Sequence, residues 1–524
     1  MSFRPFLFLL PFLALSPVLG RAQEASGSGT TAAPAASAPA PSATPDPAPA
    51  PAPPVAPGPV TATAPAAAPS DPAPTAAPAA SAASVPAAPP SPTTTTTTTI
   101  TTTVATPAPS PPAASTAPSA SSGLKVVRLG IDVLAADDFK ALAGKRVGLI
   151  TNQSGVNRKG ISTIDVLRAA PNVKLVALYG PEHGVYGAEH AGLYVASSVD
   201  TRTSLPVYSL YGDTKKPTPD MLKDIDVLVL DIQDIGARSY TFIGTMALAM
   251  EACGEAGKEF MVLDRPNPIG GNRVEGMPLG AKTLALDLKS RSLVGNLPIP
   301  YVHGLTMGEL AQMIVGEGWI KAAPKKLTVI PMKGWKREMT WKETNLAWVP
   351  PSPHIPTPES TFGYVLTGLW GDIPGIANGV GYTLPFGLVG GATIDRYALQ
   401  KGMEDRKLPG MLFIPTLFQP FYFGNKDKLL SGVQVICTDP AKANLMTTSM
   451  ALIEEIQTEL GHEVLSSMSK SDTDLFDKLC GGDTVRLHLI ARKPVADLIA
   501  SWQPFLDDFR VRREKYLLYK TTPP

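Results

Sequence analysis

Glu182 and His183 stand side by side in the short segment Gly180–Gly184, which reads G-P-E-H-G. Carboxyl and imidazole groups commonly act as general acids and bases. The preceding run from Val173 to Leu178 has the length and the branched apolar residues of a buried strand. Gly and Pro then end this strand in a tight loop. Because ligands bind beyond the strand ends of an open α/β sheet, the pair is a candidate active site.

Glu182 is the first candidate for a catalytic acid. Pro181 and the apolar strand would shield it from water, and burial raises the pKa of a carboxyl group and keeps a proton available. The alternative is a turn carboxylate that accepts hydrogen bonds from nearby backbone N–H groups. His183 can orient Glu182, contact a substrate or bind a metal together with His190. The His-x6-His spacing matches no standard metal site, so we predict a hydrogen-bonding role and no metal.

Polar residues follow three further apolar runs that are typical of strands. They are Asn152 after 145–150, Asp231, Gln233 and Asp234 after 226–230, and Asp264, Arg265 and Asn267 after 260–263. The carboxyl ends of parallel strands share one edge of a sheet, so we expect these residues to converge with Glu182 on one crevice. Each group taken alone has a simpler explanation, because Asp and Asn often form turns at strand ends.

Arg238 and Tyr240 lie shortly after the cluster formed by Asp231, Gln233 and Asp234. The cluster would contact hydroxyl groups of a sugar-like ligand or supply a second carboxylate. The planar guanidinium of Arg238 suits a ligand carboxylate, and Tyr240 offers a ring face to a sugar. A salt bridge between Arg238 and Asp234 is the alternative.

Asp264 and Arg265 are adjacent and also have two interpretations. They can contact a ligand in the crevice, or they can form an ion pair with each other. In the second case Asn267 shapes the loop, because Asn favours turns.

His303 directly precedes the sequence G-L-T-M-G-E. Thr306 and Glu309 in this sequence form a capping box, in which each side chain binds a backbone N–H at the start of a helix. Glu309 is therefore predicted to be structural. His303 either faces the crevice or does not, and we retain it as a candidate substrate-binding residue.

Strands and helices are predicted to alternate along the first part of the folded chain. The expected strands are 145–150, 173–178, 205–211, 226–230 and 260–263, and the expected helices are 161–170, 218–223 and 240–257. This alternation favours βαβ units and a mostly parallel, doubly wound α/β sheet. No G-x-G-x-x-G follows the first strand, so no nucleotide cofactor is predicted. Further helices are expected at 441–460 and 494–510.

Composition divides the chain of 524 residues into four segments. Residues 1–22 have the apolar run and small-x-small site of a signal peptide, which predicts export to the periplasm or the extracellular space. Residues 23–123 are almost entirely Ala, Pro, Ser and Thr and are expected to be a disordered linker. The remainder is predicted to hold a catalytic domain at 124–350 and a C-terminal domain at 351–524. No later stretch is apolar enough to span a membrane.

The charge of the chain is balanced, with 46 Lys and Arg residues against 45 Asp and Glu residues. No basic patch is interleaved with aromatic residues, which argues against a nucleic-acid partner. Cys253, Cys437 and Cys480 lie far apart and lack metal-type spacing. One disulfide is possible on this spacing, and three buried thiols are the favoured interpretation.

Eight stretches of the sequence together resemble the exo-acting β-N-acetylmuramidases of the NamZ type, a family formerly described as a domain of unknown function. They are GLITNQSGV from Gly148, LYGPEHGVYG from Leu178, LPVYSLYG from Leu205, KPTPDML from Lys216, DVLVLDIQDIGARSYTF from Asp226, LDRPNPIGG from Leu263, HGLTMGELA from His303 and PSPHIPTPE from Pro351. The resemblance spans essentially the whole folded part. Asn378–Gly381 departs from the family pattern, which has Glu-Gly-Arg-Gly there.

The resemblance implies a Rossmann-like N-terminal domain, a smaller α+β C-terminal domain and a cleft between them. It implies removal of terminal N-acetylmuramic acid from cell-wall glycans, with the glutamate of G-P-E-H-G, here Glu182, as the catalytic residue. Peptidoglycan fragments or muramyl sugars would be the partners. The lactyl carboxylate of N-acetylmuramic acid would then bind Arg238 or Arg265, and Asp and Asn would bind its hydroxyl groups.

In the mechanism that we expect, Glu182 protonates the leaving glycosidic oxygen. Asp231, ahead of Asp234 or Asp264, would be the nucleophile or base. Participation by the acetamido group of the substrate is an alternative that needs no protein nucleophile.

Two other functions are compatible with parts of the sequence. One is a cell-wall glycan-binding protein that uses the same cleft without catalysis. The other is a metal-dependent hydrolase or esterase, which the His spacing does not favour. A serine hydrolase is disfavoured because no G-x-S-x-G motif accompanies the predicted sheet.

Overall fold

The computed structural model describes residues 126–279 and 292–519. The predicted signal peptide at 1–22 and the predicted linker at 23–123 lie outside the described residues. Within the described ranges, no helix combines the length and the hydropathy of a membrane span. All three cysteines are free; Cys253 and Cys480 are buried, and Cys437 is partly buried.

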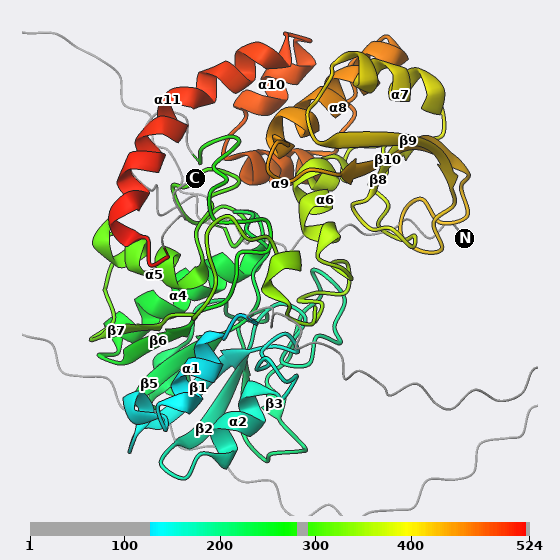
Figure 1. Cartoon of the computed structure of the whole chain (residues 1–524). Helices are drawn as coiled ribbons and strands as arrows, with labels where there is room; N and C mark the ends of the chain where they lie inside the picture. Colours follow the sequence, from blue (N-terminus) through cyan, green and yellow to red (C-terminus); the bar gives the residue numbers. More distant parts are fainter. Residues whose placement is uncertain (1–125, 280–291, 520–524) are drawn as a thin grey trace, which may run out of the picture. The chain divides into compact units, whose positions relative to one another are not determined.

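A seven-stranded sheet with the order β3-β4-β2-β1-β5-β6-β7 forms the first part of the fold (Figure 1). All neighbouring pairs are parallel except β3 with β4. The strands are β1 Arg146–Thr151, β2 Lys174–Gly180, β3 Ser198–Val199, β4 Pro206–Ser209, β5 Val227–Asp231, β6 Glu259–Leu263 and β7 Leu327–Ile330. The chain adds β2 and β4 on one side of β1 and then β5 on the other, which is the switch of direction that creates a ligand crevice in doubly wound sheets.

The central strands are apolar on both faces, and β5 shows why. Val227 and Val229 pack into one buried cluster, while Leu228 and Leu230 pack into another. Successive side chains of a strand point to opposite faces, so a sheet covered by helices on both sides needs a continuous apolar run.

Helices cover both faces of this sheet (Figure 1). Residues of α1 and α2 pack with Val227 and Val229, and residues of α4 and α5 pack with Leu228 and Leu230. The helices of the first part are α1 Gly130–Ala136, α2 Thr163–Ala169, α3 Pro219–Leu222, α4 Thr241–Glu255 and α5 Met307–Gly316. The predicted capping box between Thr306 and Glu309 starts α5.

The second part, from residue 351 onwards, contains a small antiparallel sheet with the order β8-β10-β9. Its strands are β8 Leu388–Gly391, β9 Met411–Phe418 and β10 Leu430–Cys437. Its helices are α6 Glu359–Thr367, α7 Arg396–Asp405, α8 Leu445–Leu460, α9 Lys470–Cys480, α10 Thr484–Ile490 and α11 Val495–Arg513. The predicted α/β fold, Rossmann-like and mostly parallel with a smaller α+β part, is confirmed.

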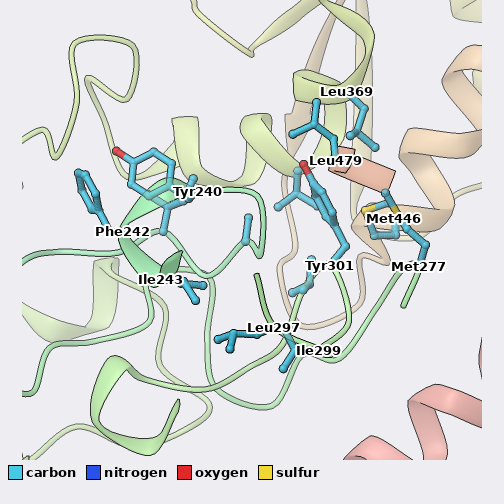
Figure 2. Packing of buried hydrophobic residues seen from close by; sticks show 14 of the residues in the cluster. Tyr240, Phe242, Ile243, Met277, Leu297, Ile299, Tyr301, Leu369, Met446 and Leu479 are labelled. Carbon is cyan, nitrogen blue, oxygen red and sulfur yellow. The ribbon is translucent and has the colours of Figure 1, made fainter. Parts of the chain in front are cut away.

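One hydrophobic core joins the two parts. Figure 2 shows Met277 and Tyr301 from the first part in the same cluster as Leu369, Met446 and Leu479 from the second. All five side chains are at least 91% buried relative to full exposure, since none exceeds 9%. A shared core of this kind fixes the second part against the strand ends of the first.

Candidate active site

Glu182 lies on a tight turn directly after β2. The turn is closed by a hydrogen bond of 2.9 Å from the Gly184 N–H to the Pro181 carbonyl. His183 in this turn has φ of +71°, in the left-handed region that non-glycine residues rarely adopt. Such a conformation costs of the order of 1–3 kcal/mol and is found mainly at functional sites. The strand-end position predicted for Glu182 is therefore the one observed.

Two hydrogen bonds hold the carboxylate of Glu182, one on each oxygen. The Gly192 N–H donates to Oε1 at 2.8 Å, and the Thr241 hydroxyl donates to Oε2 at 2.7 Å. Tyr211 also lies within hydrogen-bonding reach, and burial together with the charge of Glu182 raises the pKa of Tyr211. Glu182 itself is only partly buried. Its orientation is therefore fixed while the group stays accessible.

His183 is buried and anchors the loop that supplies Gly192. Its Nδ1 lies 2.8 Å from the carbonyl oxygen of Glu189, so Nδ1 carries the hydrogen of this bond. The Glu189 N–H returns a bond of 3.3 Å to the His183 carbonyl. Gly192 has φ of +74°, which a side chain would strain. His183 thus acts on Glu182 indirectly, through the path of the loop at 183–192.

Two tyrosines lie near both Glu182 and a second carboxylate, Asp234. Tyr240 packs edge-to-face on Tyr364 with ring centroids 5.9 Å apart, and Tyr240 is labelled in Figure 2. Burial raises the pKa of Tyr364 to about 12, and the charges of Glu182 and Asp234 act in the same direction. Burial and the same two charges also raise the pKa of Tyr240. Both carboxylates are thus close to this tyrosine pair.

Asp234 has one carboxylate oxygen without a partner. Its Oδ2 accepts a hydrogen bond of 2.7 Å from the Gly236 N–H, whereas its buried Oδ1 has none within the described residues. Burial raises the pKa of Asp234 to about 7. A buried polar atom without a partner is uncommon in folded proteins and is often explained by function. Asp234 is therefore a buried carboxylate with one oxygen that the described residues leave unpaired.

Asp231 is instead committed to an internal ion pair. The Nε of Arg265 donates to Oδ1 of Asp231 at 2.5 Å, and both side chains are at most 3% exposed. The Thr163 hydroxyl donates to Oδ2. The second nitrogen of the Arg265 fork donates to the Val156 carbonyl at 2.7 Å. This network locks the loops after β1, β5 and β6 together below the site.

Asp264 and Asn267 also bind protein groups. Asp264 Oδ2 accepts hydrogen bonds from Tyr519 at 2.5 Å and Thr306 at 2.7 Å, and Oδ1 accepts one from the Gly308 N–H at 2.8 Å. Burial raises the pKa of Asp264 to about 7. The Asn267 amide donates to the Leu305 carbonyl at 3.0 Å. These contacts join β6 to the start of α5 and to the end of the chain.

Asn152 and the segment at 350–353 connect the two parts at the switch point of the sheet. The Asn152 amide donates to the Pro351 carbonyl at 3.0 Å, and its oxygen accepts from Ser154. Gln233 donates to the carbonyls of Asp234 and Pro266 at 2.7 and 2.8 Å. The crevice predicted between these strand ends is therefore largely filled by the protein itself.

Arg238 and His303 are each only 1% exposed and bind protein groups in the interior. Arg238 donates to the carbonyls of Met277, Ile299 and Leu479 at 2.8 to 2.9 Å. His303 Nδ1 accepts from the Leu305 N–H at 3.2 Å, and burial lowers the pKa of His303 to about 3. Both side chains therefore support the joint between the two parts, in contact with protein groups.

Three residues at the site were not singled out from the sequence: Gly192, Tyr211 and Thr241. His354 was noted only as a departure from the family pattern, in which Asn is usual at this position. Tyr211 could have been found, because it follows β4 at the same edge of the sheet as Glu182. Thr241 is the first residue of α4 and follows Tyr240 in the sequence. Gly192 has no local sequence signal, because its position at Glu182 depends on how the loop at 183–192 folds back.

Two further features of the described part of the chain bear on this site: its potential metal ligands and its cavities. In residues 126–279 and 292–519, no group of three or more His, Cys, Asp or Glu side chains is placed to hold a metal ion. A cavity of about 30 Å³ is lined by Ser154, Gln233, Arg265 and Trp341 among others. Small-molecule pockets usually measure roughly 300–1,000 Å³. The cavity therefore suits water.

Known proteins match the chain along both parts. The family model described as exo-β-N-acetylmuramidase NamZ, N-terminal, matches residues 147–359, and the corresponding C-terminal model matches residues 362–519. The peptidoglycan β-N-acetylmuramidase NamZ of Bacillus subtilis (strain 168) is 45% identical over 413 residues, which cover 77% of this chain and 96% of the relative.

Two crystal structures of DUF1343 family proteins from Bacteroides fragilis NCTC 9343 are also similar. One is 46% identical with a TM-score of 0.70, covering 75% of this chain and 99% of the other. The second is 28% identical with a TM-score of 0.58, covering 76% of this chain and 100% of the other.

Proposed function

Because this chain belongs to the NamZ family of exo-β-N-acetylmuramidases, we propose that it is a glycoside hydrolase that releases terminal N-acetylmuramic acid from peptidoglycan-derived glycans. The observation that carries this proposal is the fixed, partly accessible carboxylate of Glu182 between Gly192 and Thr241. Export to the periplasm or the extracellular space is part of the proposal. The predicted signal peptide at 1–22 and the location of the substrate in the cell wall support it.

Glu182 is the proposed general acid. An ionised carboxylate has about four lone-pair positions. Gly192, Thr241 and Tyr211 account for up to three of them. The remaining position takes the proton that Glu182 delivers to the glycosidic oxygen as the bond to the leaving sugar breaks. The three donors hold the carboxyl group in one orientation toward that oxygen.

Asp234 is the proposed second carboxylate, in place of Asp231. Both oxygens of Asp231 are already bound, one by Thr163 and the other by Arg265. If Asp231 turned toward a substrate, the buried guanidinium of Arg265 would lose its counter-charge. Asp234 keeps a buried oxygen without a hydrogen bond inside the protein. It can accept the N–H of the substrate acetamido group or activate the attacking water. If Glu182 and Asp234 are the two catalytic carboxyl groups, the distance between them indicates whether the enzyme retains or inverts the configuration of the sugar.

The proposal is tested with Glu182→Gln and two substrates. One is 4-nitrophenyl β-N-acetylmuraminide, whose leaving group is weakly basic; the other is the disaccharide with N-acetylglucosamine as the leaving group. Loss of a general acid lowers kcat by roughly 10²–10⁴-fold. The loss should be larger for the disaccharide, because its leaving oxygen needs the proton more.

Glu404→Gln is the matched control, because Glu404 is exposed on α7. It should keep wild-type rates on both substrates. Equal activity of the wild type on the N-acetylglucosamine analogue would contradict specificity for muramic acid. Wild-type turnover of the disaccharide by Glu182→Gln would overturn the role of Glu182.

A further inference from the structure

Three consecutive aromatic residues are exposed on the loop between β9 and β10. Phe421, Tyr422 and Phe423 expose 59%, 44% and 41% of their surface. Phe421 and Phe423 are the only exposed phenylalanines among the described residues. Each aromatic ring can bury roughly 150–250 Å² when a partner covers it. Contiguous apolar surface of this kind on a soluble protein usually marks a binding site.

The loop that carries these rings is fixed by the backbone. The Phe421 N–H donates to the Gly381 carbonyl at 2.7 Å, and the Asp427 N–H closes the loop on the Pro420 carbonyl at 2.9 Å. Phe423 has φ of +64°, a strained conformation for a bulky residue. Tyr382 packs on Phe421 with ring centroids 5.3 Å apart. The rings are therefore held in place before any ligand binds, which reduces the entropic cost of binding.

His354 connects these rings to the active site. Its ring lies 6.3 Å from Tyr422 in a stacked arrangement and 5.6 Å from Phe423. The segment that leads to His354 lies at the sheet edge that carries Glu182, because Asn152 and Gln153 after β1 donate to the carbonyls of Pro351 and Pro350 at 3.0 and 2.8 Å. Burial lowers the pKa of His354, and the charges of Glu182 and His183 also affect it. We call Tyr382, Phe421, Tyr422, Phe423 and His354 the aromatic platform.

We propose that the aromatic platform binds the sugar that follows the terminal residue of the glycan, on the leaving-group side of the scissile bond. This inference rests on the proposed function. Glu182 protonates the oxygen shared by the terminal sugar and its neighbour, so the neighbour must lie next to Glu182, on the side where His354 connects to the rings. The C–H faces of a pyranose match the faces of aromatic rings.

The surroundings of the platform favour a neutral sugar ring as its ligand. Asn378–Gly381, the segment that packs against Phe421, contains no charged side chain. The charged side chains of the loop have partners of their own, since Lys426 pairs with Asp427 at 4.0 Å and Lys428 donates to the Gly424 carbonyl at 3.3 Å. Recognition there depends on ring contacts and hydrogen bonds. The platform thus selects glycan over a charged peptide. Its contacts lie away from the glycosidic bond, and binding energy of this kind can lower the barrier to cleavage.

The test compares two substrates that differ in the leaving group. The first is the tetrasaccharide of alternating N-acetylmuramic acid and N-acetylglucosamine. The second is the β-fluoride of N-acetylmuramic acid, whose leaving group has no ring. Phe421→Ala and Tyr422→Ala should each lower the ratio of kcat/KM for the tetrasaccharide to that for the fluoride by about tenfold. Tyr422→Trp should restore the ratio.

Tyr397→Ala is the matched control, because Tyr397 is 59% exposed on α7, like Phe421. It should leave the ratio unchanged. An unchanged ratio in Phe421→Ala and Tyr422→Ala would overturn the proposal and indicate a different occupant, such as a protein. If the wild type cleaves neither substrate, the proposed function fails, and the platform is then judged by calorimetry with the uncleaved tetrasaccharide. Weaker binding by Tyr422→Ala supports the platform, and equal binding overturns it.

Discussion

The Thr241 hydroxyl donates a hydrogen bond of 2.7 Å to Glu182 Oε2 across 59 positions of sequence. Glu182 follows β2, whereas Thr241 begins α4, the helix that follows β5. The doubly wound topology brings these two elements to the same edge of the sheet. The orientation of the proposed acid is therefore set by an element on the other side of the switch point.

Thr241→Val should reduce kcat without unfolding the protein. Valine keeps the shape of threonine but removes the donor to a carboxylate, a bond worth about 1.5–3 kcal/mol. We expect kcat on the disaccharide to fall roughly 10- to 100-fold, with little change in KM. Thr245→Val is the control, because Thr245 lies one turn further along α4 and bonds only to the Thr241 carbonyl, at 3.3 Å. Equal losses in both variants would show an effect of helix packing.

His183 should be sensitive to the shape of its replacement as well as to its hydrogen bond. His183 has φ of +71° and positions the loop that supplies Gly192. His183→Asn tolerates this backbone conformation and keeps an N–H donor, whereas the β-branched His183→Val does neither. We expect kcat to fall roughly tenfold or more in His183→Val and less in His183→Asn. Equally large losses in both variants would argue for direct acid or base chemistry by the imidazole, because neither replacement can transfer a proton.

The expected elements of the sheet could be predicted because their signals are local. The apolar run D-V-L-V-L predicts β5, because a strand buried on both faces needs apolar residues on each. The capping box of Thr306 and Glu309 predicts the start of α5 from only four residues. Strands β3, β7, β8, β9 and β10 were not predicted, and β7 and β9 show how a local pattern can miss an edge strand. β7 is half-buried throughout, and β9 contains Pro415 and exposes Leu412 and Ile414. Edge strands of this kind are defined by their partners more than by their own pattern.

The sequence predicted the site only through one rule: residues that follow parallel strands gather at one edge of the sheet. This rule placed Glu182 and Asp234 at the same edge, as observed. It could not distinguish Asp234 from Asp231, because the difference is the pairing of Asp231 with Arg265 and Thr163. Nor could it show that Arg238 binds three carbonyls from distant segments.

Asp234→Asn should lower activity and raise stability, with a defined pH dependence. The folded pKa is about 7, above the value of ~3.9 for an unfolded Asp. The folded state therefore holds a proton that the unfolded state has lost between about pH 4 and 7, so this group's contribution to stability falls as pH rises through that window. The advantage of Asp234→Asn over wild type in the free energy of unfolding should grow from pH 4 to 7 and then level off.

Urea denaturation across this pH range measures that difference, and Asp231→Asn is the contrasting variant. It leaves Arg265 buried without its counter-charge, so we expect a loss of about 3–5 kcal/mol. A pH-independent difference between Asp234→Asn and wild type would show that Asp234 is ionised throughout.

Tyr519→Phe should weaken the attachment of the chain's end to the large sheet. The Tyr519 hydroxyl donates to Asp264 at 2.5 Å and accepts from the Met332 N–H at 2.9 Å, so the substitution leaves two buried groups short of a partner. We expect a loss of about 1–3 kcal/mol in the free energy of unfolding. The hydroxyl stabilises the ionised form of Asp264, whose pKa is about 7, so the loss should be larger at pH 9 than at pH 5.

Tyr397→Phe, at an exposed position, is the control in the same urea titrations. An identical loss at both pH values would mean that the hydroxyl contributes through its bond from the uncharged Met332 N–H and not through the Asp264 carboxylate.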